Sequence, residues 1–70
     1  MIRVIVNGVS FYTTKRRIES GVGSHTSVNM AVRSVFELMQ TRPKLKGIST
    51  RIAVYNHKME QEYFDVQIDK

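Results

Sequence analysis

The chain of 70 residues contains no cysteine and only one proline, and its apolar runs are short. Without cysteine, neither a disulfide nor a thiolate zinc site stabilises the fold, which suits a reducing compartment, and we expect a cytoplasmic protein. No run approaches the about 20 apolar residues that span a bilayer. The chain begins directly with a strand pattern, so we expect no membrane segment and no signal peptide.

A chain of this length suits one domain, which we expect to span residues 1–70. A core this small stabilises a fold by roughly 3–5 kcal/mol. Self-association adds buried area, so we expect a homodimer. The 11 Lys and Arg residues against six Asp and Glu give a formal net charge of +5. This charge favours polyanionic partners, nucleic acid before anionic lipid or acidic protein, although in many small domains it serves solubility alone.

Asn7-Gly8 is the strongest local signal in the chain. These two residue types accept the positive φ angles of a type I′ turn, which joins two strands in a tight hairpin. Apolar and polar residues alternate on both sides of the turn, so we expect strands at about 2–6 and 9–14. The predicted cross-strand pairs are Val6 with Val9, Val4 with Phe11, and Arg3 with Tyr12.

A helix is predicted to begin near Ser27 and to stop before Pro43, which cannot continue a helical ladder. Its apolar stripe follows the 3.6-residue period, and Thr26 or Ser24 is the expected N-cap. The stripe consists of Val28, Ala31, Val32, Val35, Phe36, Leu38 and Met39. Residues 15–27, rich in turn formers, are interpreted as a connection.

A second hairpin is expected at about 48–56 and 61–69. A three-residue loop at 57–59 would place Arg51 opposite Asp65 and Ala53 opposite Tyr63, and a five-residue loop would shift these partners but keep the faces. The fold class is therefore α+β: a ββαββ chain whose four-stranded antiparallel sheet packs one helix on one face. The order of the two hairpins in the sheet stays open.

Strand alternation divides this sheet into an inner, apolar face and an outer face in water. The inner residues are Val4, Val6, Val9, Phe11, Ile48, Thr50, Ile52, Val54, Phe64, Val66 and Ile68. The outer face carries every tyrosine of the chain and two arginines. These outer residues, which form a candidate binding surface, are Arg3, Tyr12, Arg51, Tyr55 and Tyr63.

Catalytic chemistry has little support in the sequence. There is no cysteine nucleophile, and His25 and His57 lie singly in predicted loops without metal-ligand spacing. Asp65 and Asp69 share a strand face but stand ~13 Å apart, too far to share a metal ion or a proton. We expect no enzyme activity, no metal and no cofactor.

The segment before the helix suggests an anion site. Glycines and hydroxyls that lead into a helix can present free amides to a phosphate, and Gly23, Ser24 and Thr26 are the candidate residues. The lysine of a phosphate-binding loop is missing, so a flexible connection with a Ser or Thr cap is the simpler interpretation. Arg16 and Arg17 beside the segment keep the phosphate site open.

The leading hypothesis is a non-enzymatic module that binds RNA or single-stranded DNA. Clustered cations bind phosphate backbones through counterion release, and exposed aromatic rings stack on unpaired bases. Tyr12, Tyr55 and Tyr63 would stack, and Arg3, Lys15, Arg16, Arg17 and Arg51 would contact phosphates. A secondary basic patch, around the end of the helix, consists of Arg42, Lys44 and Lys46.

Other interpretations remain open. Tyrosine and arginine are also enriched at protein interfaces, so the alternative is a protein-interaction module, such as an inhibitor of a host enzyme with an acidic surface. Tyrosine also favours strands without any further role. A third hypothesis is a phosphate-ligand or enzymatic domain that uses the Gly/Ser segment. In general style the chain is similar to small phage-encoded accessory proteins that bind host factors, which would place it in the host cytoplasm.

Overall fold

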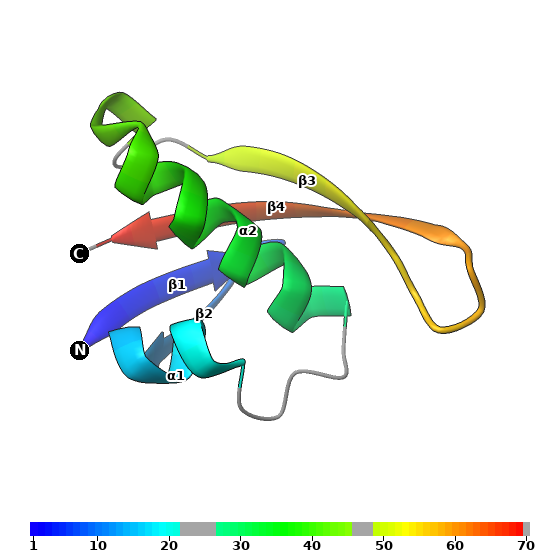
Figure 1. The fold of residues 1–70 in the computed structure, drawn as a ribbon, viewed down its shortest axis with the longest axis horizontal. Helices are drawn as coiled ribbons and strands as arrows, with labels where there is room; N and C mark the ends of the chain where they lie inside the picture. The colour runs from blue at the N-terminus through cyan, green and yellow to red at the C-terminus, as the bar shows by residue number, and fades with distance from the viewer. Residues whose placement is uncertain (22–26, 46–48, 70) are drawn as a thin grey trace.

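Two hairpins form one four-stranded antiparallel sheet in the computed structural model, which describes residues 1–21, 27–45 and 49–69. The strands lie in the order β2-β1-β4-β3, with helices on one face (Figure 1). In chain order the elements are β1 (Ile2–Val6), β2 (Val9–Thr13), α1 (Lys15–Ser20), α2 (Ser27–Thr41), the 3-10 turn η1 (Pro43–Leu45), β3 (Thr50–Tyr55) and β4 (Gln61–Asp69). The predicted α+β class is confirmed.

The first hairpin has the predicted turn and register. Asn7 and Gly8 have φ angles of 49° and 84°, both positive as a type I′ turn requires. Val6 lies opposite Val9, and the pairing continues outward to Arg3 opposite Tyr12. Asn7 also extends β1 along β4, because its backbone N donates to the Asp65 carbonyl and its Oδ1 accepts from the Asp65 N, both at 2.9 Å.

Gly8→Val should therefore lower the free energy of unfolding by more than about 1 kcal/mol, because a β-branched residue resists positive φ. No heavy atom lies within 4 Å of a Cβ built at Gly8, so crowding does not contribute to the loss. Gly8→Asn is the matched control, since asparagine tolerates the left-handed region, and it should lose clearly less. Urea melts of the three proteins measure the difference; superimposable Val and wild-type curves would contradict the strained-turn explanation.

The second hairpin has the three-residue loop. Tyr55 pairs with Gln61, and the register places Arg51 opposite Asp65 and Ala53 opposite Tyr63, as predicted. Asn56 organises the loop: its Oδ1 accepts from the backbone N of Lys58 at 2.9 Å and of Glu60 at 3.0 Å. Met59 has a φ of 62°, in the region that closes such loops.

The hairpin order, which the sequence left open, joins β1 to β4 at the centre of the sheet. Val4 pairs with Ile68 and Val6 with Val66, so the two central strands supply the most buried positions of the inner face. Past the contact of Asn7 with Asp65, the β3–β4 hairpin has no β1 neighbour and projects from the body (Figure 1). We name this segment, residues 51–64, the arm. The arm is thus the extension of the sheet past its first hairpin.

The long helix α2 covers β4 and β3 and reaches β1, and its predicted stripe faces the sheet. Ala31, Val32, Val35, Phe36 and Met39 are buried in it, while Val28 and Leu38 are half-buried. The helix ends at Thr41, two residues before Pro43, as expected. The predicted caps Ser24 and Thr26, and the inner-face residue Ile48, lie outside the described residues.

The interpretation of residues 15–27 as a connection is wrong for its first part, because Lys15–Ser20 form the helix α1. Thr14 caps the helix, with its Oγ1 accepting from the Arg17 N at 3.2 Å, and Gly21 ends it with a φ of 64°. The helix contributes one apolar side chain, Ile18, to the core. The sequence contained both end signals, but a single apolar residue gave no helical period.

The inner face of β2 is less buried than predicted. Val9 is 69% exposed and Phe11 38% exposed, although both lie on the helix side of the sheet. A helix about 10 Å across covers about two strands spaced about 4.8 Å apart, and α2 lies over the other side of the sheet. Within the described residues, α1 is the other helix on this face, and a hollow lies between it, β2 and α2.

Candidate nucleic-acid interface

The three tyrosines lie on the outer face of the sheet, opposite α2, and all are exposed. The exposed fractions are 64% for Tyr12, 59% for Tyr55 and 53% for Tyr63. Each is a strand residue that alternation turns away from the core. Their rings are therefore accessible to a partner from the outer face.

The structure separates these tyrosines into two groups. Tyr12 lies beside Arg3, which in turn lies beside Asp69 of β4. Tyr63 precedes Asp69 by six residues on the same strand, which corresponds to about 20 Å along the sheet. The outer face therefore carries two separate aromatic positions, where the sequence pattern alone suggested one surface.

One of the two groups lies on the arm and consists of Tyr55 and Tyr63 together with Arg51. The guanidinium carbon of Arg51 lies 5.3 Å from the centroid of the Tyr63 ring, a cation–π contact. The Tyr63 hydroxyl donates to Gln61 Oε1 at 3.0 Å. Tyr55, opposite Gln61, is the diagonal neighbour of Tyr63, at about 7–8 Å between backbones. This cluster is compact and is held by its own side chains.

The second group, which we name the basic end, consists of Arg3, Tyr12, Lys15, Arg16 and Arg17. The register places Arg3 beside Tyr12, and α1 starts two residues after Thr13, so its three cations follow Tyr12 closely in the chain. Lys15 pairs with Glu19 at 3.9 Å. Among the described residues, neither Arg16 nor Arg17 lies in an ion pair, and both are exposed.

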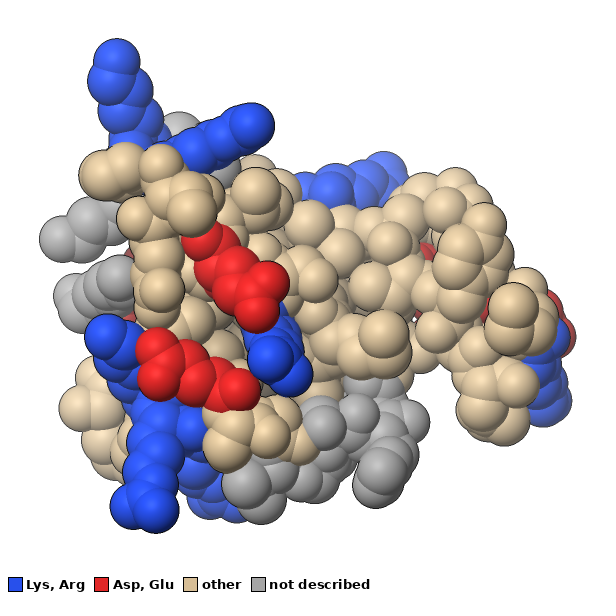
Figure 2. Space-filling model, viewed as in Figure 1, with Lys and Arg blue, Asp and Glu red and all other residues tan. Residues whose placement is uncertain are grey.

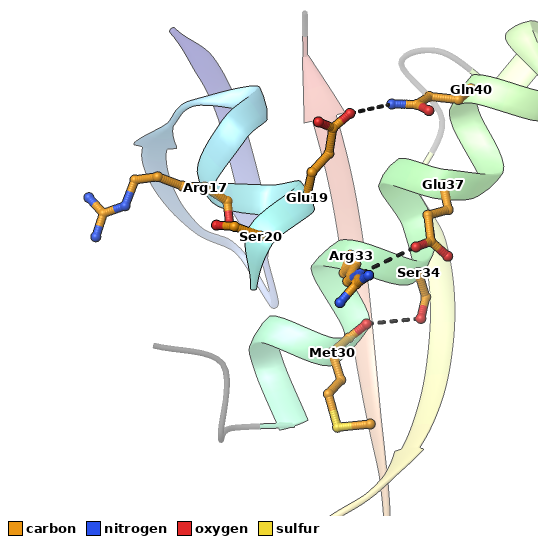
Figure 3. A network of polar contacts seen from close by, with 8 residues as sticks. All are labelled: Arg17, Glu19, Ser20, Met30, Arg33, Ser34, Glu37 and Gln40. Atoms are coloured by element: carbon orange, nitrogen blue, oxygen red, sulfur yellow. Dashed lines mark hydrogen bonds and ion pairs between the residues drawn. The ribbon is translucent and has the colours of Figure 1, made fainter. Parts of the chain in front are cut away.

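The polar contacts between α1 and α2, and along α2, are made by residues other than Arg16 and Arg17. Gln40 Nε2 of α2 donates to Glu19 Oε1 of α1 at 3.4 Å, and Arg33 pairs with Glu37 at 3.3 Å. Figure 3 shows Glu19 turned toward Gln40, whereas the Arg17 side chain extends from α1 on the side away from α2. Arg17 is therefore directed toward solvent, in a position to contact a ligand.

The excess positive charge lies on the helical segments and not on the outer face of the sheet. On the strands themselves, Arg3 lies opposite Asp69 and Arg51 opposite Asp65, so acids accompany both arginines. The excess of cations lies on the helical segments, at the end of the molecule that holds both termini (Figures 1 and 2). There, α1 supplies Lys15, Arg16 and Arg17, Arg42 lies between α2 and η1, and η1 supplies Lys44.

Several candidate residues lie outside the described part of the chain: Gly23, Ser24 and Thr26 of the suggested anion site, His25, and Lys46 of the secondary basic patch. Within residues 1–21, 27–45 and 49–69, no three His, Cys, Asp or Glu side chains gather as metal ligands. Over the same ranges, no helix has the length and apolar character needed to cross a membrane.

Comparison with protein-family models, with curated proteins and with solved structures finds no match to this chain.

Proposed function

We propose that this protein is a small, non-enzymatic cytoplasmic module that binds RNA or single-stranded DNA at its basic end. The observation that carries the proposal is the pair Arg16 and Arg17, exposed and outside the described ion pairs, on a helix that begins three residues after Tyr12. Two guanidinium groups would bind successive phosphates, and the Tyr12 ring would stack on a base between them and Arg3.

The position of these cations supports a role outside the fold. Lys15 and Arg16 begin the first turn of α1, where no acidic residue lies, and Arg17 belongs to its last turn. The first turn of a helix carries a partial positive charge, so cations there destabilise it slightly and anions stabilise it. Lys15 and Arg16 thus contribute little to stability, and a bound phosphate would relieve the repulsion between them.

A protein partner is the second candidate, and the arm is the observation that favours it. Tyr55, Tyr63 and Met59 are all more than half exposed on a projecting hairpin, beside Arg51. Tyrosine, methionine and arginine are enriched at protein interfaces. An inhibitor of a host enzyme with an acidic surface would use this arm.

The homodimer expected from the sequence stays a prediction, and β2 is the sheet edge that we propose for it. Val9–Thr13 carries no charge and no proline, the usual features that protect an edge, whereas the other edge strand, β3, carries Arg51. A second copy would continue the sheet by antiparallel pairing of β2 with its own equivalent, so this dimer and a nucleic acid that passes around the β2 edge would exclude each other.

Titration of fluorescent oligouridine and oligothymidine tests the nucleic-acid proposal. At low salt the dissociation constant should lie below about 100 μM, the weak limit for non-specific binding. The logarithm of affinity should fall linearly with the logarithm of salt, by about 0.7 for each phosphate contacted in a single strand. Absence of binding at low salt, where charge attraction is strongest, would reject the proposal and leave the tyrosines to a protein partner.

A further inference from the structure

A hollow of about 220 Å³ opens between the edge strand β2, the helix α1 and the first half of α2. Among the described residues, α2 lies over β3 and β4, and the six-residue α1 leaves this side of β2 partly exposed. Its lining includes Phe11, Thr13, Arg17, Ile18, Asn29 and Val32. Phe11, whose partial exposure was not expected from the sequence, forms part of this wall.

The size of the hollow limits what it holds. Its volume exceeds that of an apolar cavity of about 150 Å³ that binds benzene, but falls below the about 300–1,000 Å³ of pockets for drug-sized ligands. One planar ring system fits this volume, whereas a complete nucleotide does not. The occupant is therefore a single ring with its polar substituents outside.

The lining side chains define the chemistry of that ring. Phe11, Ile18 and Val32 supply apolar contacts for its faces, while Thr13 brings a hydroxyl group for its edge. No carboxylate is among the described lining residues, and Arg17 is the one cation among them. A nucleobase has an apolar face, a polar edge and an attached phosphate, and so matches this combination.

We propose that the hollow holds one base of the bound single strand, unstacked from its neighbours, while its phosphate contacts Arg17. This inference rests on the proposed function and extends it from the outer face to the edge of the sheet. The strand would pass around β2, with one base on Tyr12 and the next in the hollow beside Phe11. Because Tyr12 and Phe11 are adjacent on opposite faces, the edge strand would lie between the two bases.

The first test is Phe11→Leu, titrated with an oligouridine of about eight nucleotides, within the range that one small domain contacts. Loss of one stacked base should weaken binding by about 5- to 150-fold and leave the salt slope unchanged. Val9→Leu is the matched control, because Val9 lies on the same strand and face but does not line the hollow. It should bind as wild type does.

The second test uses the wild-type protein, so it does not depend on how the variant folds. The methyl NMR signals of Ile18 and Val32 should shift when the same oligouridine is added, and should not shift with inorganic phosphate alone. If oligouridine binds but these signals stay in place and Phe11→Leu retains full affinity, the hollow is not a base site, although the proposed function stands.

Two further outcomes also overturn the inference. If no oligouridine binds, both proposals fall together. If the Ile18 and Val32 signals move with protein concentration alone, a side chain from a second copy occupies the hollow, and the base site is rejected.

Discussion

Phe36→Ala is expected to leave the protein largely unfolded at 25 °C. Phe36 is 1% exposed and is the largest fully buried side chain, on the face of α2 that packs on the sheet. Truncation of a buried phenylalanine costs about 3–5 kcal/mol, from the lost transfer free energy and the cavity left behind. Domains of this size have about 3–5 kcal/mol of stability in total, so the substitution removes most of it.

Circular dichroism during a urea titration measures this effect. Alanine is a better helix former than phenylalanine, so helix propensity does not explain a loss. Met30→Ala, on the same helix at a residue that is half exposed, is the control and should retain a cooperative transition near that of wild type. A Phe36→Ala protein with a wild-type midpoint would mean that the core is not centred under α2.

The sequence predicted both hairpins because their information is local. The Asn7-Gly8 turn specifies one register, and the three-residue loop after Asn56 specifies the other. Alternation then assigns every side chain to a face. The apolar stripe of α2 is equally local, and it is buried as its period indicates.

The order of the hairpins is not local, and the main corrections follow from it. Pairing of β1 with β4 depends on contacts between residues about sixty positions apart, such as Asn7 with Asp65. This order places β2 at an edge, where α2 does not cover Phe11, and sets Tyr12 far from Tyr63. A sequence pattern assigns side chains to a face of the sheet but gives no distances across it. The three tyrosines, which the pattern assigned to one surface, therefore lie at two separate positions.

The short helix α1 shows a different limit. Ile18 is the only apolar residue among its six, so the segment has no period to recognise. Its ends were visible in Thr14 and Gly21, yet capping residues also occur in turns. The helix buries Ile18 and packs against α2, so it depends on the tertiary structure. The positions of Arg16 and Arg17 depend on this helix, and so does the candidate site.

The double variant Arg16→Ala, Arg17→Ala should make the salt dependence of oligonucleotide binding shallower by about one to two units of log–log slope, roughly one for each lost phosphate contact. The control is Arg33→Ala with Lys58→Ala, which lowers the formal charge by the same amount from +5. Arg33 pairs with Glu37 on α2 and Lys58 lies in the arm loop, so this variant should retain the wild-type slope. Equal slopes for the two double variants would mean that net charge, and not the basic end, determines binding.

Tyr12→Ala should behave in the opposite way on the same plot. Loss of one stacked base lowers affinity by about 1–3 kcal/mol at every salt concentration, because stacking releases few counterions, and the slope stays close to that of wild type. Tyr55→Ala, on the arm about 26 Å away along the sheet, separates the two groups of tyrosines. If the strand binds only at the basic end, Tyr55→Ala should have little effect. Equal losses for Tyr12→Ala and Tyr55→Ala would mean that the strand crosses the whole outer face, and a loss for Tyr55→Ala alone would move the site to the arm.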